Sequence, residues 1–232
     1  MGSEIKDLSF TLACVMVRGK NRDYSPIYVE RLRDMVRRYT DRPFRTVCLT
    51  DQPKTMPAGV VAVKVPSVAK GERGWWRKIT LFHPKAPFKG RVLYLDLDVL
   101  VVGNINPILD FPADFAIAPD CAPKFQGNRQ WKTVKGYNSS VMVWDHLARS
   151  RFYTKFDPKS PLRLWGDQDS IKEMSPNERT FPGEWFKRIT PEGPAKWIPE
   201  TKIILCVKYK NHKAIELFPW FRNYWTVGNE DD

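Results

Sequence analysis

Cysteine is scarce in this sequence of 232 residues, and none of its four cysteines has the paired C-x-x-C spacing of a zinc or redox site. Three of them, Cys14, Cys48 and Cys206, lie in apolar runs that predict strands, where a thiol behaves as a small buried hydrophobe. A disulfide framework and a zinc site are therefore disfavoured. We expect reduced thiols in a cytoplasmic protein.

Long apolar runs and targeting signals are also lacking. No apolar run approaches the roughly 20 residues that a membrane-spanning helix needs, and residues 1–6 do not resemble a secretory signal. Internal repeats, low-complexity linkers and a second-domain boundary are absent as well. Because 42% of the residues are hydrophobic, the chain can bury a substantial core. We predict a single domain over residues 1–232, with a basic, aromatic tail from about residue 208.

Acidic residues are too few to balance the basic ones. The sequence has 26 aspartates and glutamates but 38 lysines and arginines, which gives a formal net charge of +12. Such a charge favours anionic partners: nucleic acid, a phospholipid surface, a phosphorylated glycan or a nucleotide. A solvated basic surface is the simpler alternative, so charge alone selects no function.

The first third of the sequence contains alternating strand and helix patterns. Continuous apolar runs predict strands at residues 10–17, 44–50 and 60–65, and Ser25 with Pro26 predicts the start of a helix that extends to about residue 39. This order predicts an α/β fold with a mixed, mainly parallel central sheet and right-handed crossovers. Further strands are predicted at 92–102, 139–144 and 202–207, further helices at 75–82, at 145–148 and from 166, and a less regular stretch around Pro107, Pro112, Pro119 and Pro123.

In sheets of this kind, ligands bind beyond the carboxyl ends of the strands. The loops that follow the first two strands are therefore the expected contacts for a nucleotide. The candidate residues in these loops are Val17, Arg18, Gly19, Tyr24, Thr50 and Asp51.

Two carboxylates interrupt the most apolar run of the sequence, residues 92–102. Asp96 and Asp98 are two residues apart, so in a strand both side chains point to the same side. Like charges this close repel each other and raise a pKa, and a divalent cation removes that problem. Carboxylate oxygens suit Mn²⁺ or Mg²⁺, with diphosphate oxygens completing the coordination. The alternative is a pair of solvated aspartates that cap neighbouring loops.

This run, Val92-Leu-Tyr-Leu-Asp-Leu-Asp-Val-Leu-Val-Val-Gly-Asn-Ile105, resembles the metal-binding strand of GT-A-fold glycosyltransferases, the group that contains glycogenin and bacterial lipopolysaccharide galactosyltransferases. Three more segments resemble that family in the same order: Gly74-Trp-Trp-Arg-Lys78, Tyr137-Asn-Ser-Ser-Val-Met-Val143 and Gly166-Asp-Gln-Asp-Ser170. Together, the resemblance covers residues 10–207.

The resemblance implies a metal-dependent enzyme that moves a hexose from a UDP-sugar to a hydroxyl acceptor, with Mn²⁺ or Mg²⁺ as cofactor. It makes Asp98 the best direct metal ligand and assigns Asp96 to the metal, the ribose or both. The other donor contacts that it implies are Lys78, Asn138 and Ser139. The identity of the donor sugar stays open among glucose, galactose and their N-acetyl forms.

The same resemblance points to retention of anomeric configuration, with Gln168 beside the reacting carbon. Asp167 or Asp169 would then hold sugar hydroxyls or the acceptor. An inverting enzyme would instead need a carboxylate base, for which Asp167, Asp169 or Glu184 are candidates. Asp167 could also be an ordinary helix N-cap.

Two positions depart from the family pattern. Ser140 stands where the family has glycine, which narrows the space beside the sugar. The late His-x-x-Gly-x-x-Lys-Pro segment is not preserved, and the corresponding region is Cys206-Val-Lys-Tyr-Lys-Asn-His212-Lys. His212 is a candidate third metal ligand, with surface exposure as the simpler alternative. Lys208 and Lys210 are candidates for contacts with the diphosphate.

Residues 124–137 combine cations with aromatic rings and contain no acid. This composition suits a phosphate backbone with stackable bases, so a hydroxymethylated DNA base is one candidate acceptor. A glycan or lipopolysaccharide core is another, and a lid over an anionic donor is the simpler alternative. The predicted acceptor contacts are Lys124, Arg129, Trp131, Lys132 and Lys135.

A protein of a different class would also fit the charge. It would be a non-catalytic, basic nucleic-acid-binding protein that has kept a nucleotide-sugar fold. Metal-dependent release of UDP from a donor distinguishes the enzyme from this alternative.

Overall fold

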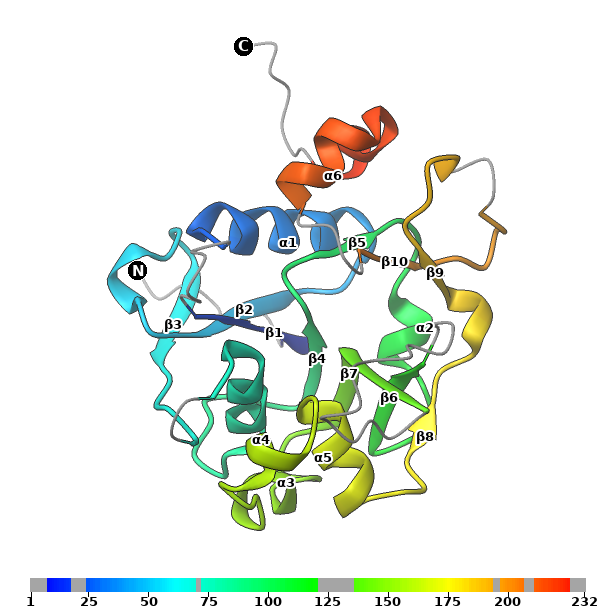
Figure 1. The fold of residues 1–232 in the computed structure, drawn as a ribbon. Helices are drawn as coiled ribbons and strands as arrows, with labels where there is room; N and C mark the ends of the chain where they lie inside the picture. The colour runs from blue at the N-terminus through cyan, green and yellow to red at the C-terminus, as the bar shows by residue number, and fades with distance from the viewer. Residues whose placement is uncertain are drawn as a thin grey trace.

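The computed structural model describes residues 8–17, 24–69, 72–120, 136–193, 197–206 and 211–225, which form an α/β fold (Figure 1). The strands are β1 (Phe10–Met16), β2 (Phe44–Thr50), β3 (Val60–Lys64), β4 (Arg91–Leu95), β5 (Val99–Val101), β6 (Phe115–Pro119), β7 (Tyr137–Asp145), β8 (Arg179–Thr180), β9 (Phe186–Arg188) and β10 (Ile203–Leu205). The helices are α1 (Pro26–Arg38), α2 (Asn106–Leu109), α3 (Arg151–Thr154), α4 (Ser160–Arg163), α5 (Asp167–Met174), α6 (Asn211–Leu217) and α7 (Arg222–Trp225), with 3-10 turns η1 (Pro53–Thr55), η2 (Gly74–Phe82), η3 (Gly183–Trp185) and η5 (Pro219–Phe221).

The central sheet has seven strands in the order β3-β2-β1-β4-β7-β6-β8. The first four strands in this order are mutually parallel, and β7 is antiparallel to both β4 and β6. The predicted mixed, mainly parallel sheet is therefore confirmed. Because β1 to β4 run the same way, their carboxyl ends share one edge, and the first residues of β7 lie at that edge too.

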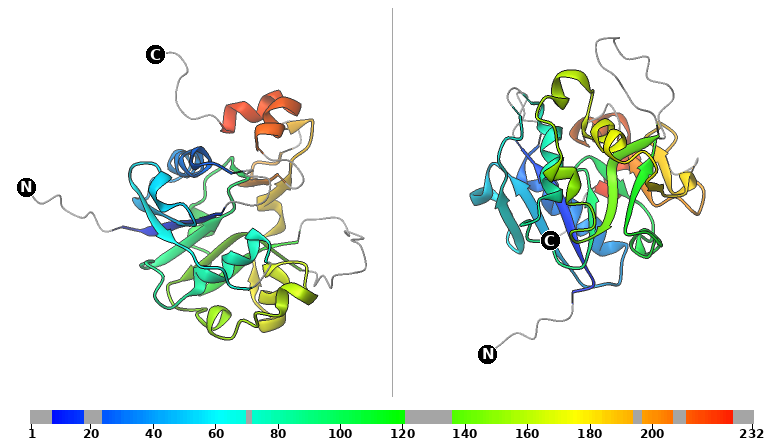
Figure 2. Two further views of the ribbon diagram at one scale, coloured as in Figure 1. Left: turned by 60° about the vertical axis from the view of Figure 1, so that its left-hand side comes forward. Right: turned by 90° about the horizontal axis from the view of Figure 1, so that it is seen from below.

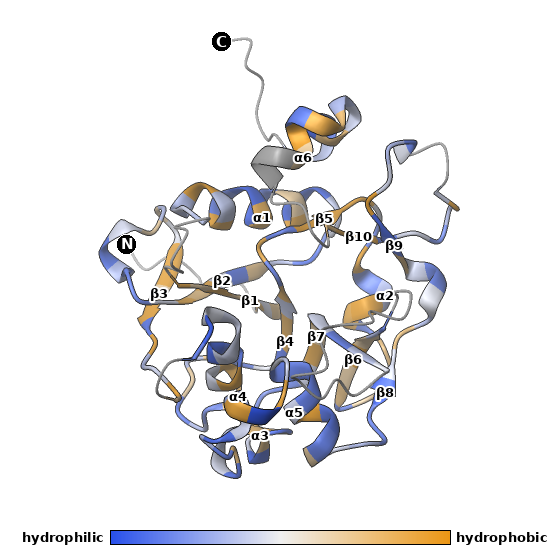
Figure 3. Cartoon of the chain, in the orientation of Figure 1, coloured by the Kyte–Doolittle hydropathy of each residue, from blue (hydrophilic) through white to orange (hydrophobic). Residues whose placement is uncertain are grey.

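Each face of the sheet has its own hydrophobic core, as the alternation of side chains along a strand requires. In β1, Phe10, Leu12, Cys14 and Met16 belong to the core on the α1 side, whereas Ala13 belongs to the core on the side of η2, α3 and α5. The amphipathic helix α1 shows both colours in Figure 3, and its buried residues are Tyr28, Val29, Leu32, Met35 and Val36.

A second, three-stranded sheet has the order β5-β10-β9 and lies beyond the carboxyl end of β4. It packs with α1, and α7 contacts both α1 and β5. The C-terminal helices therefore lie beside α1, as Figure 1 and the left view of Figure 2 show.

The prediction of one strand over residues 92–102 is wrong. The chain leaves the central sheet after Leu95, turns at Asp96–Asp98 and enters the second sheet as β5. Both halves are buried and apolar, so the composition of the run resembles one long strand. The turn was not visible in the apolar pattern because it contains no glycine or proline.

Two other local predictions need correction. The stretch expected to be irregular because of its prolines contains strand β6. Pro119 is the last residue of this strand, where the missing N–H of proline is tolerated. The helix expected after Asp145 is a series of turns, with Leu147 in the left-handed region at a φ of 74°, and helix α3 begins only at Arg151.

The three described cysteines lie in the core. Cys14, Cys48 and Cys206 are buried and form no disulfide. Within the described segments, no helix has both the length and the apolarity needed to cross a membrane.

Candidate active site

Asp96 lies where β4 meets β7, at the carboxyl edge of the sheet. Its backbone N–H donates to the carbonyl of Ser140 (2.9 Å), which extends the strand pairing by one residue. The N–H of Val99 then donates to the carbonyl of Asp96 (3.4 Å) and closes the turn that contains Asp98. The two carboxylates predicted as a pair therefore stand on a turn between two sheets, and not on one strand.

A lysine ammonium group compensates the charge of Asp96. Nζ of Lys78, from η2, lies 2.9 Å from Oδ1 and 3.0 Å from Oδ2 of Asp96, and it also donates to Oγ of Ser139 (3.2 Å). It is 4.0 Å from Oδ1 of Asp167. Lys78 is only 8% exposed, so these contacts form in a largely water-free environment.

The pKa values in this cluster shift in opposite directions. Burial by itself would raise the pKa of Asp96, but Lys78 and the hydroxyls of Tyr94 and Ser140 outweigh it, and the pKa is lowered. Burial raises the pKa of Asp167, and Lys78 offsets this only in part. Burial would lower the pKa of Lys78, but Asp167 and Asp96 raise it, so the lysine stays protonated.

Helix α5 brings two further carboxylates to the site. Gly166 is its N-cap, and Oδ2 of Asp169 accepts the backbone N–H of Gly166 (3.0 Å). Asp169 therefore caps the helix, whereas Asp167, the first helical residue, faces Lys78. Oδ2 of Asp167 is buried and has no hydrogen-bond partner among the described residues.

Ser139 and Gln168 connect β7 to α5. Oγ of Ser139 donates to Oε1 of Gln168 (3.4 Å) and accepts from Nζ of Lys78. Ser139 therefore links Gln168, the predicted catalytic residue, to Lys78. Asn138 has a local role, because its Oδ1 accepts the backbone N–H of Ser140 (2.8 Å). The structure therefore places Lys78, Asp96, Ser139, Asp167 and Gln168 in one cluster.

Asp98 has a hydrogen-bond partner from a different part of the chain. The hydroxyl of Tyr24 donates to Oδ2 of Asp98 (2.8 Å). Burial and the charge of Asp98 raise the pKa of Tyr24, so the phenol keeps the proton that it donates.

The donor set at this turn fits a divalent cation that is shared with a ligand. Lys78 already neutralises Asp96, which leaves Asp98 as the carboxylate better placed to bind a cation. Among the described residues, no third histidine, cysteine or acid joins them in a group that could hold a metal. Mg²⁺ commonly binds one or two carboxylates and takes its other ligands from phosphates and water, and these residues match that arrangement.

The predicted donor loops lie along the same edge. Val17 follows β1 and contacts the start of η2, where a Cβ on Gly74 would come within 2.8 Å of Cγ2 of Val17. Thr50 is fully buried, and its Oγ1 accepts the backbone N–H of Gln52 (3.0 Å). Asp51 accepts a long hydrogen bond from the Gln52 amide (3.4 Å).

Several predicted site residues lie outside what the structure describes. These are Arg18 and Gly19 of the first loop, all five predicted acceptor contacts (Lys124, Arg129, Trp131, Lys132 and Lys135), and Lys208 and Lys210. The backbone of His212 belongs to α6, but its side chain is not described. Glu184, the third candidate base, is exposed in η3.

Sequence reasoning missed two features of the site. The hydroxyl of Tyr94 donates to Oδ1 of Asp96, and the two-residue spacing from Asp96 could have indicated it. Arg73, Trp75 and Trp165 form a cluster beside α5, with the Arg73 guanidinium 5.1 Å and 5.0 Å from the two ring centroids. Nε1 of Trp75 donates to the carbonyl of Trp165 (3.3 Å), which links η2 to the residue before Gly166.

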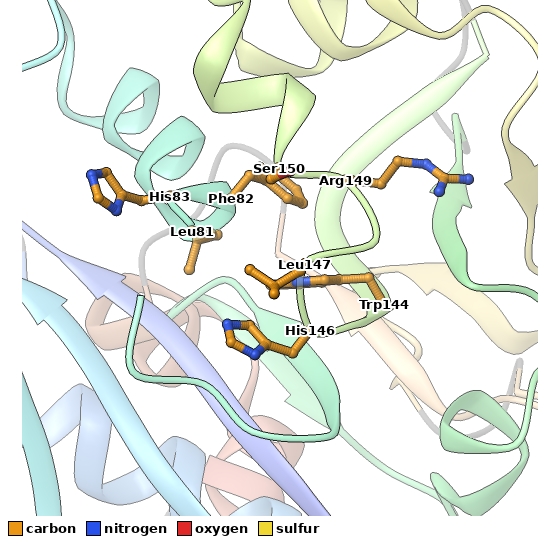
Figure 4. Close-up of a pocket in the computed structure, with 8 residues that line it drawn as sticks. All are labelled: Leu81, Phe82, His83, Trp144, His146, Leu147, Arg149 and Ser150. Atoms are coloured by element: carbon orange, nitrogen blue, oxygen red, sulfur yellow. The ribbon is translucent and has the colours of Figure 1, made fainter. Parts of the chain in front are cut away.

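A small depression at the far end of β7 is unrelated to this cluster. Its lining residues include His83, Trp144, His146 and Leu147 (Figure 4). β7 reaches this end at Asp145, five residues after Ser140, whose carbonyl accepts the N–H of Asp96, and no predicted site residue lines the depression.

Comparison with known proteins identifies the fold. No protein-family model matches the sequence, and no curated protein matches it. The structure is similar to galactosyltransferase LgtC in complex with donor and acceptor sugar analogs (14% identity, TM-score 0.59, 95% of this chain and 98% of that chain). It is also similar to an active-site mutant of LgtC in which glutamate replaces glutamine (13%, 0.60, 95% and 98%).

The glycosyltransferase GlyE of Streptococcus pneumoniae TIGR4 is a third similar structure, at 12% identity and a TM-score of 0.64. The match covers 96% of this chain but 61% of GlyE. At these identities the likeness concerns the fold, and the predicted GT-A fold is confirmed.

Proposed function

We propose that this protein is a metal-dependent glycosyltransferase that moves a hexose from a UDP-sugar to a hydroxyl group of an acceptor. The observation that carries the proposal is the buried Lys78 ammonium between Asp96 and Asp167, at the edge of a GT-A-fold sheet and next to Asp98. Opposite charges and hydroxyl groups concentrated in a buried place are costly to the fold alone, and they suit recognition of a polar ligand.

The cluster supports binding of a sugar through its hydroxyl groups. Oδ2 of Asp167 is a buried acceptor without a partner among the described residues, and a sugar hydroxyl is a suitable donor to it. Lys78 and Ser139 fix the orientation of Asp167 and Asp96 around that position. The direct role of Asp169 is to cap α5, so we assign the sugar contact to Asp167.

Asp98 would hold Mn²⁺ or Mg²⁺ together with the diphosphate of the donor. A bound divalent cation stabilises the negative charge that grows on the departing diphosphate. Lys78 lowers the pKa of Asp96 and balances its negative charge. We therefore assign Asp96 to contacts that orient the donor and not primarily to cation binding. Val17, Thr50 and Asp51 stand where the nucleoside would approach the same edge.

Gln168 is our candidate for the residue beside the reacting carbon, and retention is the expected stereochemical outcome. Its side chain reaches the cluster through Ser139. An active-site glutamine is also the residue replaced in the LgtC mutant of similar fold. The anomeric configuration of the product, measured by proton NMR, tests this assignment directly.

The first experiment measures release of UDP from a panel of UDP-sugars with and without Mn²⁺. We expect metal-dependent release in the wild type and loss of that release in Asp98→Ala, with the far-UV circular dichroism spectrum retained. Asp157→Ala, at an exposed position, is the matched control and should release UDP as the wild type does. Release that is equal in Asp98→Ala and the wild type would reject the assigned metal site.

The second experiment identifies the acceptor. LgtC binds an acceptor sugar analog, so a glycan panel is the first set of probes, and hydroxymethylated and unmodified DNA duplexes form the second. Mass spectrometry of the products reports donor and acceptor together. Label on glycans alone would reject a DNA acceptor, and DNA binding without any UDP release would favour the non-catalytic alternative.

A further inference from the structure

The hydrogen bond between Tyr24 and Asp98 joins two distant parts of the chain. Tyr24 stands just before the N-cap of α1, and Asp98 lies 74 residues later in the turn between β4 and β5. The distance of 2.8 Å is that of a well-formed O–H···O bond. The hydroxyl group therefore restricts the rotation of the carboxylate that we assign to the metal.

Edge-to-face aromatic contacts hold the ring of Tyr24. The ring meets Tyr28 edge to face, with centroids 5.2 Å apart and planes at 90°. Tyr28 in turn meets Trp225 at 4.9 Å, and the guanidinium of Arg31 lies 5.1 Å from the Trp225 ring. Tyr28 is 6% exposed and Trp225 is 1% exposed, so two of the three rings are fixed in the core.

This arrangement leaves the carboxylate able to bind a cation. An ionised carboxylate has two oxygens with about four lone-pair sites, so donation by Tyr24 to Oδ2 is compatible with coordination by the same group. Metal-binding side chains are commonly oriented by a second hydrogen-bonding partner, which preorganises the site and strengthens binding.

We infer that Tyr24 is a positioning residue for the metal: its hydroxyl fixes the orientation of Asp98, and Trp225 supports it through Tyr28. The inference rests on the proposed function. It gives the C-terminal helix α7 a role at the site, although α7 contributes no residue to the cluster around Lys78.

The test measures Mn²⁺ affinity in the presence of UDP, by electron paramagnetic resonance of free Mn²⁺. Tyr24→Phe removes only the hydroxyl, and we expect the Kd for Mn²⁺ to rise about tenfold or more. Tyr39→Phe is the matched control, since Tyr39 caps the other end of α1 and should leave the Kd unchanged. The UDP release of Tyr24→Phe should recover at saturating Mn²⁺, which a general loss of structure would not allow.

Trp225→Leu tests whether the aromatic contacts of Tyr28 and Trp225 support the position of Tyr24. It should weaken Mn²⁺ binding in the same direction, and the double variant with Tyr24→Phe should bind no more weakly than Tyr24→Phe alone, because both changes act through one hydroxyl. Additive losses would show that Trp225 acts by another route and would overturn that part of the inference.

Two outcomes overturn the role of Tyr24. An unchanged Kd in Tyr24→Phe shows that the hydroxyl does not orient the ligand, and a lower Kd shows that it competes with the cation. A wild-type protein that binds no Mn²⁺ with UDP overturns the proposed metal dependence, and this role with it.

Discussion

Nζ of Lys78 lies within 3.0 Å of both carboxylate oxygens of Asp96, and this ion pair connects η2 to the turn after β4. The pair is buried on the lysine side and also faces Asp167. Loss of Lys78 would leave the carboxylates of Asp96 and Asp167 without a compensating cation, and an uncompensated buried charge is strongly destabilising.

Lys78→Met should therefore reduce the free energy of unfolding by about 3 kcal/mol, measured by urea denaturation. Two carboxylates would then face each other without a cation. The double variant with Asp96→Asn removes one of those charges and should recover part of the loss. An unfolding free energy of Lys78→Met equal to that of the wild type would contradict the importance of this pair.

The raised pKa of Asp167 predicts an acid limb in the pH profile. The pKa of an ordinary aspartate is about 3.9, and burial raises the pKa of Asp167 above it. If the ionised carboxylate accepts a sugar hydroxyl, kcat/KM should fall as the pH decreases through this raised pKa. Asp167→Asn should lack that limb, and an identical profile in the variant would assign the limb to another group.

The same shift affects stability with a defined sign. The folded state binds the proton of Asp167 more tightly than the unfolded chain does. Its contribution to the free energy of unfolding is therefore greatest below the ordinary pKa and decreases as the pH rises through the raised value. Denaturation of Asp167→Asn at several pH values should lack this slope.

The side chain of Val17 leaves room only for glycine at position 74. A Cβ at position 74 would come within 2.8 Å of Cγ2 of Val17, which is closer than real side chains approach. Gly74→Ala should cost about 1–3 kcal/mol, and Val17→Ala in the same chain should recover much of it. Gly183→Ala is the control, because nothing lies within 4 Å of a Cβ there. Equal losses in both glycine variants would contradict this explanation.

Glu178 anchors the start of β7 through a network of ion pairs. Its carboxylate accepts from Nε and Nη2 of Arg149 (2.7 and 2.9 Å) and from Ser175, and its N–H donates to the hydroxyl of Tyr137. The side chain of Glu178 is only 6% exposed, so Glu178→Gln should lower the free energy of unfolding by about 3 kcal/mol.

The matched control is an exposed pair. Arg163 and Glu173 lie 2.6 Å apart on the surface, and Glu173→Gln should cost less than about 1 kcal/mol. Similar losses in Glu173→Gln and Glu178→Gln would show that burial does not decide the strength of these pairs.

The sequence determined much of the sheet and of the candidate site. β2 begins and ends at the predicted residues, and β1 and α1 differ from their predictions by about one residue. These elements can be predicted from short segments, because a continuous apolar run indicates a buried strand and apolar residues at helical spacing indicate an amphipathic helix. For the same reason, the motifs around Lys78, Asp96, Ser139 and Asp167 could be located before their distances were known.

Only the tertiary structure decided how those motifs meet. Residues 92–102 divide between two sheets because Asp96 pairs with Ser140 and the chain then turns toward β10. Asp169 caps α5 and leaves Asp167 to face Lys78, and Tyr24 donates to Asp98 over a separation of 74 residues. These contacts join residues far apart in the chain, and their geometry depends on how helices pack on the sheet, which no local pattern of residues encodes.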